Sequence, residues 1–449
     1  MRITATLAAT LLAWSASAPA AESALAPLDS IYPELEKLSI DIHQNPELSQ
    51  HEEKTSAKLA EKLRALGFRV TDHIGGFGVV GILENGPGPT VMVRTELDAL
   101  PVEEKTGLPY ASHVTTKDDS GATVPVAHAC GHDIHMAAWT GAATLLSRAR
   151  DRWHGTLMMI AQPDEEKGSG ARLMLTEGLF TKFRKPDYAI AMHDSADLPS
   201  GTIGITPGYA FANVDSVDLI VYGRGGHGAN PSKTVDPIVI AARTVVALQT
   251  IVSREINPLD PAIVTVGSIH GGTKHNIIPD EVKMQLTVRS YSDDVRKHLL
   301  DSIARIAKAE AAAAGAPREP LVKVLAGDPA VYNDPGLSKR LLQTFQRVFG
   351  TTKAAEIRPV MVSEDFSEYG RAGVPSVQFW VGAVNPQKLE QAKAAGTPLP
   401  SLHSSEWAPD REPAIKTAVT AEVSAALELF GSRPPSRPAS RPPKADPRQ

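Results

Sequence analysis

Val214-Asp215-Ser216-Val217-Asp218-Leu219-Ile220-Val221-Tyr222 has the composition of a β-strand, and it begins a run of elements that determines the architecture. The elements expected after it are a helix over 236–253, strands over 263–269 and 282–290, an Ala-rich helix over 293–314 and a strand over 321–325. The order βαββαβ closes as a four-stranded antiparallel sheet with two helices on one face. We therefore expect an inserted ferredoxin-like domain over 209–327.

The sequence on either side of this insertion has the texture of an α/β protein. Helical spacing is found over 29–66, 136–150, 335–349 and 413–430, and short apolar strands over 79–83, 90–94, 156–161, 188–192 and 376–381. A chain of 449 residues exceeds the size at which one hydrophobic core usually stops growing. We predict a discontinuous α/β catalytic domain formed by 21–208 and 328–431, with the substrate site in the cleft beside the insertion.

Composition and charge exclude several function classes. The formal net charge of −5 is opposite to the basic excess typical of nucleic-acid binders, so no nucleic-acid partner is expected. The glycines are dispersed and form neither a Walker motif nor a strand-anchored dinucleotide fingerprint. Phosphate-cradling functions are therefore not indicated.

Both ends of the chain predict segments outside the folded domains. Arg2, an apolar stretch and the small residues Ala18-Pro19-Ala20 are typical of a signal peptide over 1–20, with cleavage after Ala20. The apolar stretch is too short to be a comfortable membrane span, so we expect export to the periplasm or medium without a stable anchor. Residues 432–449 form a Pro/Ser/Arg-rich segment that cannot bury a core.

The only cysteine lies in the run His128-Ala129-Cys130-Gly131-His132-Asp133. Cys130 and His132 are two residues apart, so both side chains can point the same way in an extended or turning backbone, and Asp133 could orient one of them. A buried structural thiol is the alternative. So many hydrogen-bonding side chains in one short run are hard to bury without a metal or a polar network, which favours a metal site.

Further metal-type side chains follow predicted strands or lie in loops. They are Glu165-Glu166, His193, Glu364-Asp365 and His403. Singly, each would more often be a surface group or a satisfied core residue. Together with Cys130 and His132 they provide enough ligands for two divalent ions, and of two adjacent carboxylates one can ligate while the other acts as general base.

With these residues in place, the sequence resembles a known family. It is similar to the dimetal amidohydrolase/carboxypeptidase branch of the aminoacylase-type metallopeptidases, which includes hippurate hydrolases and auxin-conjugate hydrolases. The resemblance extends from about Leu28 to Gly431. Its motifs are Asp98-Ala99-Leu100-Pro101, 128–135, Gln162-Pro163-Asp164-Glu165-Glu166, Gly225-Gly226-His227, Asn276-Ile277-Ile278-Pro279, Ser363-Glu364-Asp365-Phe366-Ser367 and His403-Ser404.

The resemblance implies roles for individual residues. The metal ligands would be Cys130, His132, Glu166, His193 and His403. Glu165 would be the general base and later protonate the leaving amine, and Asp98 would orient the metal site.

In the inserted domain, the resemblance implies a lid that mediates dimerisation. His227 would reach the active site of a partner chain to stabilise the oxyanion, with glycines on both sides allowing close backbone approach. Asn276 and Arg289 would hold the carboxylate of the substrate, for which a guanidinium offers bidentate geometry; the alternative for Arg289 is an ordinary strand-end cation.

One motif departs from the family pattern. Where this branch has Arg-Ala-Asp, the chain has Arg94-Thr95-Glu96, and the longer side chain of Glu96 could shift the groups around the metal site. Glu364 is expected near the site, either beside a ligand or as a hydrogen-bond partner of the substrate.

These observations predict an exported homodimeric hydrolase that cleaves the amide bond of N-acyl amino acids or short peptides with a free carboxylate. Its cofactors would be two divalent ions per subunit, for which zinc, manganese, cobalt and nickel suit the mixed ligands similarly. The alternatives are a non-catalytic metal or acyl-amino-acid binding protein on the same scaffold, and a hydrolase that uses Cys130 as a thiol nucleophile.

Overall fold

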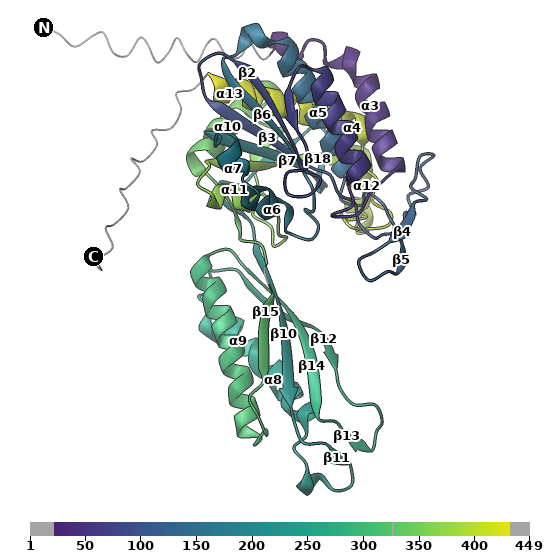
Figure 1. Ribbon diagram of the computed structural model, residues 1–449, viewed down its shortest axis with the longest axis vertical. Coiled ribbons are helices and arrows are strands. Elements are labelled where there is room, and N and C mark those ends of the chain that lie inside the picture. Colours follow the sequence, from purple (N-terminus) through teal and green to yellow (C-terminus); the bar gives the residue numbers. More distant parts are fainter. Residues whose placement is uncertain (1–21, 326, 432–449) are drawn as a thin grey trace, which may run out of the picture.

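The structure is a computed structural model that describes residues 22–431 except residue 326. The described chain forms two bodies, which lie one above the other in Figure 1. The predicted signal peptide and the predicted C-terminal tail lie outside the described residues.

The larger body is built on an eight-stranded mixed sheet. Its strands, in spatial order, are β1 (Arg69–Thr71), β2 (Val79–Asn85), β6 (Gly155–Gln162), β3 (Thr90–Glu96), β7 (Tyr188–Pro199), β18 (Ser376–Val384), β8 (Ile203–Ile205) and β17 (Ala354–Glu356). The central strands β6, β3, β7 and β18 are parallel to one another. Their carboxyl ends therefore meet at one edge, where open α/β sheets place their ligands.

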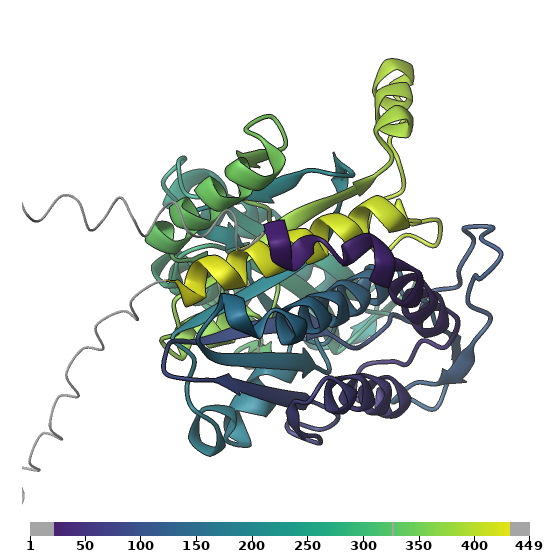
Figure 2. The ribbon, with the colours of Figure 1, turned by 90° about the horizontal axis from the view of Figure 1, so that it is seen from above.

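Helices cover both faces of this sheet. One face packs against α3 (Leu28–Gln44), α4 (Glu53–Ala65), α5 (His132–Arg148), α10 (Pro335–Phe349) and α13 (Arg411–Phe430), and the other against α6 (Gly170–Thr176), α7 (Leu179–Lys182) and α11 (Ser367–Arg371). Figure 2 shows α13 crossing the sheet beside α5 and α3. Alternation along β3 sends Val91 and Val93 into the first core and Met92 into the second, so the strand is buried on both faces.

The smaller body confirms the predicted βαββαβ fold. Its strands β10 (Asn213–Tyr222), β12 (Ala262–His270), β14 (Glu281–Ser290) and β15 (Leu321–Leu325) form an antiparallel sheet in the order β12-β14-β10-β15. The helices α8 (Pro237–Thr250) and α9 (Asp293–Ala313) pack against it around a separate hydrophobic core. We call this body the lid.

Side-chain caps fix the start of both lid helices. The Asp236 carboxylate accepts a hydrogen bond from the Ile238 amide at 2.9 Å, and the Ser292 hydroxyl accepts one from the Val295 amide at 3.2 Å. Each cap satisfies a backbone donor that the first turn leaves without a partner.

A two-stranded antiparallel sheet forms the far end of the lid. Its strands β11 (Gly226–His227) and β13 (Ile277–Ile278) pair with each other and lie at the end of the lid farthest from the larger body (Figure 1). This small sheet contains His227, and Asn276 directly precedes its second strand.

Candidate active site

The predicted metal ligands gather at the carboxyl edge of the central strands. Glu165 and Glu166 follow β6, His193 lies in β7, and Asp98 follows β3. Cys130 and His132 come from the turn that starts α5, and His403 from the loop before α13. Parallel strands thus bring together residues that are widely separated in the sequence.

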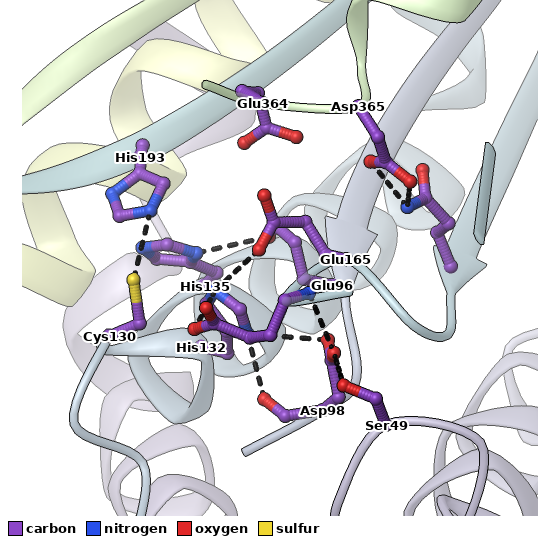
Figure 3. A network of polar contacts seen from close by, with 12 residues as sticks. Ser49, Glu96, Asp98, Cys130, His132, His135, Glu165, His193, Glu364 and Asp365 are labelled. Atoms are coloured by element: carbon purple, nitrogen blue, oxygen red, sulfur yellow. Dashed lines mark hydrogen bonds and ion pairs between the residues drawn. The ribbon is translucent and has the colours of Figure 1, made fainter. Parts of the chain in front are cut away.

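Cys130 is at the centre of the cluster, as Figure 3 shows for its contact with His193. Its Sγ lies 3.5 Å from His193 Nε2 and 3.2 Å from His403 Nε2. Two sets of three potential ligand atoms, each set within 4.8 Å, share this sulfur: Cys130/His132/His193 and Cys130/Glu166/His403. The arrangement is suited to two neighbouring cations.

A glycine makes the turn at Cys130 possible. Gly131 has φ of +77°, a backbone conformation that side chains with a Cβ rarely adopt. A Cβ at this position would also lie 2.4 Å from the Asp194 carboxylate. Gly131 therefore allows Cys130 and His132 to point into the same site at the start of α5. His403, with φ of +66°, adopts a similarly unusual backbone.

Backbone carbonyls orient two of the imidazoles. His132 Nδ1 donates to the carbonyl of Asp98 at 2.8 Å, and His193 Nδ1 donates to the carbonyl of Asp194 at 2.8 Å. Both contacts direct Nε2 toward the cluster, and His132 Nε2 has no hydrogen-bond partner within the described chain. A fixed imidazole with a free nitrogen is the usual form of a metal ligand.

Two carboxylates near the ligands have different partners. The Asp98 carboxylate accepts hydrogen bonds from the Ser49 hydroxyl at 2.6 Å and the Glu166 amide at 2.9 Å, so it holds the loop that carries Glu166. Asp133 instead contacts His43 Nδ1 at 3.2 Å. The suggestion that Asp133 orients Cys130 or His132 is therefore wrong.

The electrostatics of the cluster fit bound cations. Burial, reinforced by Glu166 and Glu165, raises the pKa of the Cys130 thiol, and burial raises the pKa of Glu166 to about 7. One Glu166 oxygen is buried without a hydrogen bond in the described part of the chain. Burying several carboxylates and a thiol together is unfavourable unless positive charge compensates them, and divalent cations would provide that charge.

A buried arginine organises the acidic groups behind the ligands. Arg94 in β3 contacts Glu96 and lies 2.9 Å from Glu364 and 2.8 Å from Asp365. Glu96 continues the network through His135 Nδ1 at 3.0 Å, and His135 Nε2 lies 3.1 Å from Asp194. The longer Glu96 side chain thus bridges Arg94 to the groups beside His193, and Glu364 is held by Arg94 at the edge of the site.

Replacing Arg94 with methionine is expected to destabilise the protein by at least about 3 kcal/mol, because three buried carboxylates lose their shared cation. Chemical denaturation of the purified variant measures this change. Arg64→Met is the matched control, since Arg64 pairs with Asp72 on the surface and should cost at most about 1 kcal/mol. Equal effects of the two substitutions would contradict the assigned network.

The cluster opens into a cavity of about 530 Å³. Its lining includes Glu165, His403 and Arg289 from β14, and Phe211 and Trp380 provide apolar wall. The volume is in the range of sites for small organic ligands. The cavity therefore joins the metal-type residues to Arg289, one of the two lid residues expected to hold the carboxylate of the substrate.

The other lid residues lie elsewhere. His227 and Asn276 are at the small two-stranded sheet of the far end, and the strand from Glu281 to Arg289 alone spans roughly 26 Å. Within one chain, Asn276 and Arg289 therefore do not form a pair, and His227 does not reach the cluster. Asn276 and Arg289 could hold the same substrate carboxylate only in a site assembled from two chains.

Three site residues had no role assigned from the sequence, although Arg94 and His135 lie in motifs quoted above. Arg94, His135 and Asp194 are fully or almost fully buried and link the acidic groups to the ligands. Two features of the sequence could have indicated them: Arg94 is a cation in the middle of the apolar strand β3, and Asp194 is an acid directly after His193.

The comparisons with known proteins agree with these motifs. Residues 92–402 match peptidase family M20/M25/M40. The chain is 36% identical to thermostable carboxypeptidase 2 of Saccharolobus solfataricus over 393 residues, covering 86% of this chain and 93% of the relative. It is 37% identical to the hippurate hydrolase of Campylobacter jejuni over 336 residues, covering 74% of this chain and 84% of the relative.

Solved structures show the same architecture. A putative aminohydrolase from methicillin-resistant Staphylococcus aureus matches with a TM-score of 0.80 at 28% identity, over 91% of this chain and 99% of the other. The YXEP protein of Bacillus subtilis, described as a dinuclear metal binding peptidase, matches with a TM-score of 0.71 at 27% identity, over 89% and 99%. The chain belongs to peptidase family M20/M25/M40 and is a hydrolase of that family.

Proposed function

We propose that the protein hydrolyses the amide bond of N-acyl amino acids or short peptides that carry a free carboxylate. The observation that carries the proposal is the pair of ligand groups that share Cys130, with Glu165 beside them. Glu165 belongs to neither of these two groups and lies with His132 and Glu166 in a third. Cys130, His132, Glu166, His193 and His403 would hold two divalent cations. When bound, these cations would polarise the scissile carbonyl and make water more acidic.

Glu165 is placed to act as the general base. It lines the cavity, and its carboxylate lies 3.9 Å from Nε2 of the proposed ligand His132. Burial raises the pKa of Glu165, and Glu364 is the next largest cause, so this carboxylate has a strong affinity for a proton. It can take a proton from the attacking water and give it to the leaving amine.

Arg289 is suited to hold the substrate carboxylate. It lines the cavity, its Nη1 donates to the Met361 carbonyl at 2.8 Å, and burial alone lowers its pKa. No carboxylate of the described chain compensates this guanidinium. An anionic end of the substrate would supply the missing partner.

The relatives act on substrates of this class. Their names refer to carboxypeptidase activity, to hippurate and to N-acetyl-L-cysteine. Hippurate and N-acetyl-L-cysteine are both N-acyl amino acids with a free carboxylate. Similarity to the YXEP protein, a dinuclear metal binding peptidase, supports two metals per site.

A homodimer through the lid would complete the site. The outer face of α8 exposes apolar side chains, with Val239 54% and Val246 71% exposed, and β12 is an edge strand of the lid sheet. The helical segment Pro237–Glu255 has the length and the apolar composition of a membrane span. It nevertheless packs against the lid core. A second lid would cover both features and bring His227 toward the partner's cavity.

Mixing two inactive variants is expected to restore activity. His227→Ala removes the residue donated to the partner, and Glu165→Gln inactivates the chain's own site. In a mixed dimer the His227→Ala chain would receive His227 from the Glu165→Gln chain, so random exchange should recover about a quarter of wild-type activity. Mixing Glu165→Gln with Glu166→Gln is the control that should recover none, and no recovery in the first mixture would contradict a shared site.

We also propose that the protein is exported. The proposal rests on the signal-peptide pattern of residues 1–20 alone. N-terminal sequencing of protein recovered outside the cytoplasm should begin at Ala21; recovery of the uncleaved chain in the cytoplasm would contradict it.

The proposed activity is tested by amine release from N-acetyl, N-benzoyl and dipeptide substrates before chelation, after chelation and after addition of zinc, manganese, cobalt or nickel. We expect activity to disappear with the chelator and to return with at least one metal. Activity that survives chelation would instead indicate Cys130 as a nucleophile, and no hydrolysis by any metal-loaded sample would favour a binding protein.

A further inference from the structure

The cavity contains a buried carboxylate that the proposed mechanism does not use. Asp328 lies where the chain returns from the lid to the larger body, and it lines the same cavity as Glu165 and Arg289. It is only 6% exposed, and its Oδ1 has no hydrogen-bond partner in the described chain. Proteins normally give a buried carboxylate oxygen a hydrogen bond or an ion pair, and this oxygen has no hydrogen bond within the described residues.

Neighbouring cations are already paired with other acids. Arg172 lies 3.8 Å from Glu368, and Arg296 lies 2.6 Å from Asp215. Burial, followed by repulsion from Glu364, raises the pKa of Asp328 to about 7. Arg172 and Arg296 lower this pKa only in part, so Asp328 is incompletely compensated and can accept a further positive charge inside the cavity.

Asp328 is in contact with the loop that carries the general base. A Cβ on Gly168 would lie 2.2 Å from Asp328 Oδ2, so the carboxylate packs directly against the backbone of that glycine. The Gly168 amide in turn donates to the Glu165 carbonyl at 2.7 Å. Asp328 is therefore held against the loop that carries Glu165, inside the cavity that both residues line.

Asp328 and Arg289 lie on opposite sides of one strand. Val214 of β10 is paired with Arg289 of β14, and its amide donates to the Asp328 carbonyl at 3.0 Å on the other side. Two strand spacings place the backbones of Asp328 and Arg289 about 10 Å apart. The cavity is therefore lined by a carboxylate and a guanidinium whose backbones lie two strands apart, an arrangement that can receive the two charged ends of a zwitterion.

We propose that Asp328 binds the α-ammonium group of the acyl part of the substrate while Arg289 holds the carboxylate, so that the preferred substrates are dipeptides with a free amino terminus. This inference rests on the proposed function, because it uses the same cavity and the same role of Arg289. Asp328 would be a specificity-determining residue.

The test compares two ligands that differ only by exchange of an ammonium for a methyl group, glycyl-L-leucine and N-propionyl-L-leucine. Calorimetric binding to the zinc-loaded Glu165→Gln protein should favour glycyl-L-leucine by roughly tenfold or more. Adding Asp328→Asn should remove this preference. Asp293→Asn is the matched control, since Asp293 is exposed, pairs with Arg371 and does not line this cavity, and it should retain the preference.

Hydrolysis of both compounds by the zinc-loaded wild-type protein separates the two proposals. A binding preference that depends on Asp328, with no hydrolysis of either compound, would support the inference and contradict the proposed activity. Hydrolysis of both compounds with equal binding, or a preference that persists in Asp328→Asn, would overturn the inference and leave the proposed activity intact.

Discussion

Glu165→Gln is expected to lower kcat by about 10³-fold, within the range that general acid–base catalysis contributes. Glutamine keeps the size of the side chain but cannot accept the proton of the attacking water. Glu165 is outside both ligand groups that share Cys130. It forms a further group with His132 and Glu166, but glutamine keeps an oxygen at that position, so the variant should keep the same metal content as wild type. Steady-state hydrolysis and elemental analysis of the same sample measure the two quantities.

The neighbouring residue provides the control for this prediction. Glu166 is in a ligand group with Cys130 and His403, so Glu166→Gln should lose metal as well as activity. A Glu165→Gln protein that loses metal, or that retains most of its activity, would contradict the division of roles between the two adjacent carboxylates.

Cys130→Ala is expected to lower metal affinity by more than about 100-fold, because even residues that only orient a ligand typically contribute 10- to 100-fold. Its sulfur is shared by both ligand groups, so one substitution should weaken both cation positions. Activity at limiting metal should fall in parallel. Competition with a chromogenic chelator measures the affinity.

The same variant distinguishes a metal ligand from a nucleophile. His193 and His403 both lie near the sulfur, so a thiol nucleophile with an imidazole base has to be tested. If Cys130 were the nucleophile, Cys130→Ala would bind two metal ions normally and still be inactive. That result would contradict the ligand assignment.

The sequence predicted those elements whose pattern is local. The helix expected over 335–349 is found as Pro335–Phe349, with the Asp334 carboxylate accepting a hydrogen bond from the Leu337 amide at 2.7 Å. The lid strands alternate between the core and solvent along β10 and β14, so their periodicity was sufficient. The cluster of metal-type side chains could be predicted because parallel strands end at a common edge.

Features that depend on tertiary contacts were missed. The segment 29–66, expected to be helical throughout, is divided into α3 and α4. The break contains Pro46 and Leu48, and Leu48 forms an isolated β-bridge with Ala99. α5 begins at His132, before the residues expected, because the left-handed conformation of Gly131 precedes it. The three-residue strands β8 and β17 are too short to show a periodic pattern in the sequence. They form because β8 pairs with both β17 and β18.

Site residues in networks were also not predictable from local patterns. Arg94 and Glu364 are 270 residues apart, and their contact needs the completed fold. Asp328 gave no signal because nothing around it in the sequence places it beside Gly168. In both cases the chemistry depends on burial and on distant partners.

The most direct test of the dimetal hydrolase is an activity titration of metal-free protein with the best activating cation. The ligand groups that share Cys130 predict that hydrolysis rises with added metal and reaches its maximum at two ions bound per chain, counted by elemental analysis. Full activity in metal-free protein, or a maximum at one ion per chain, would contradict the account.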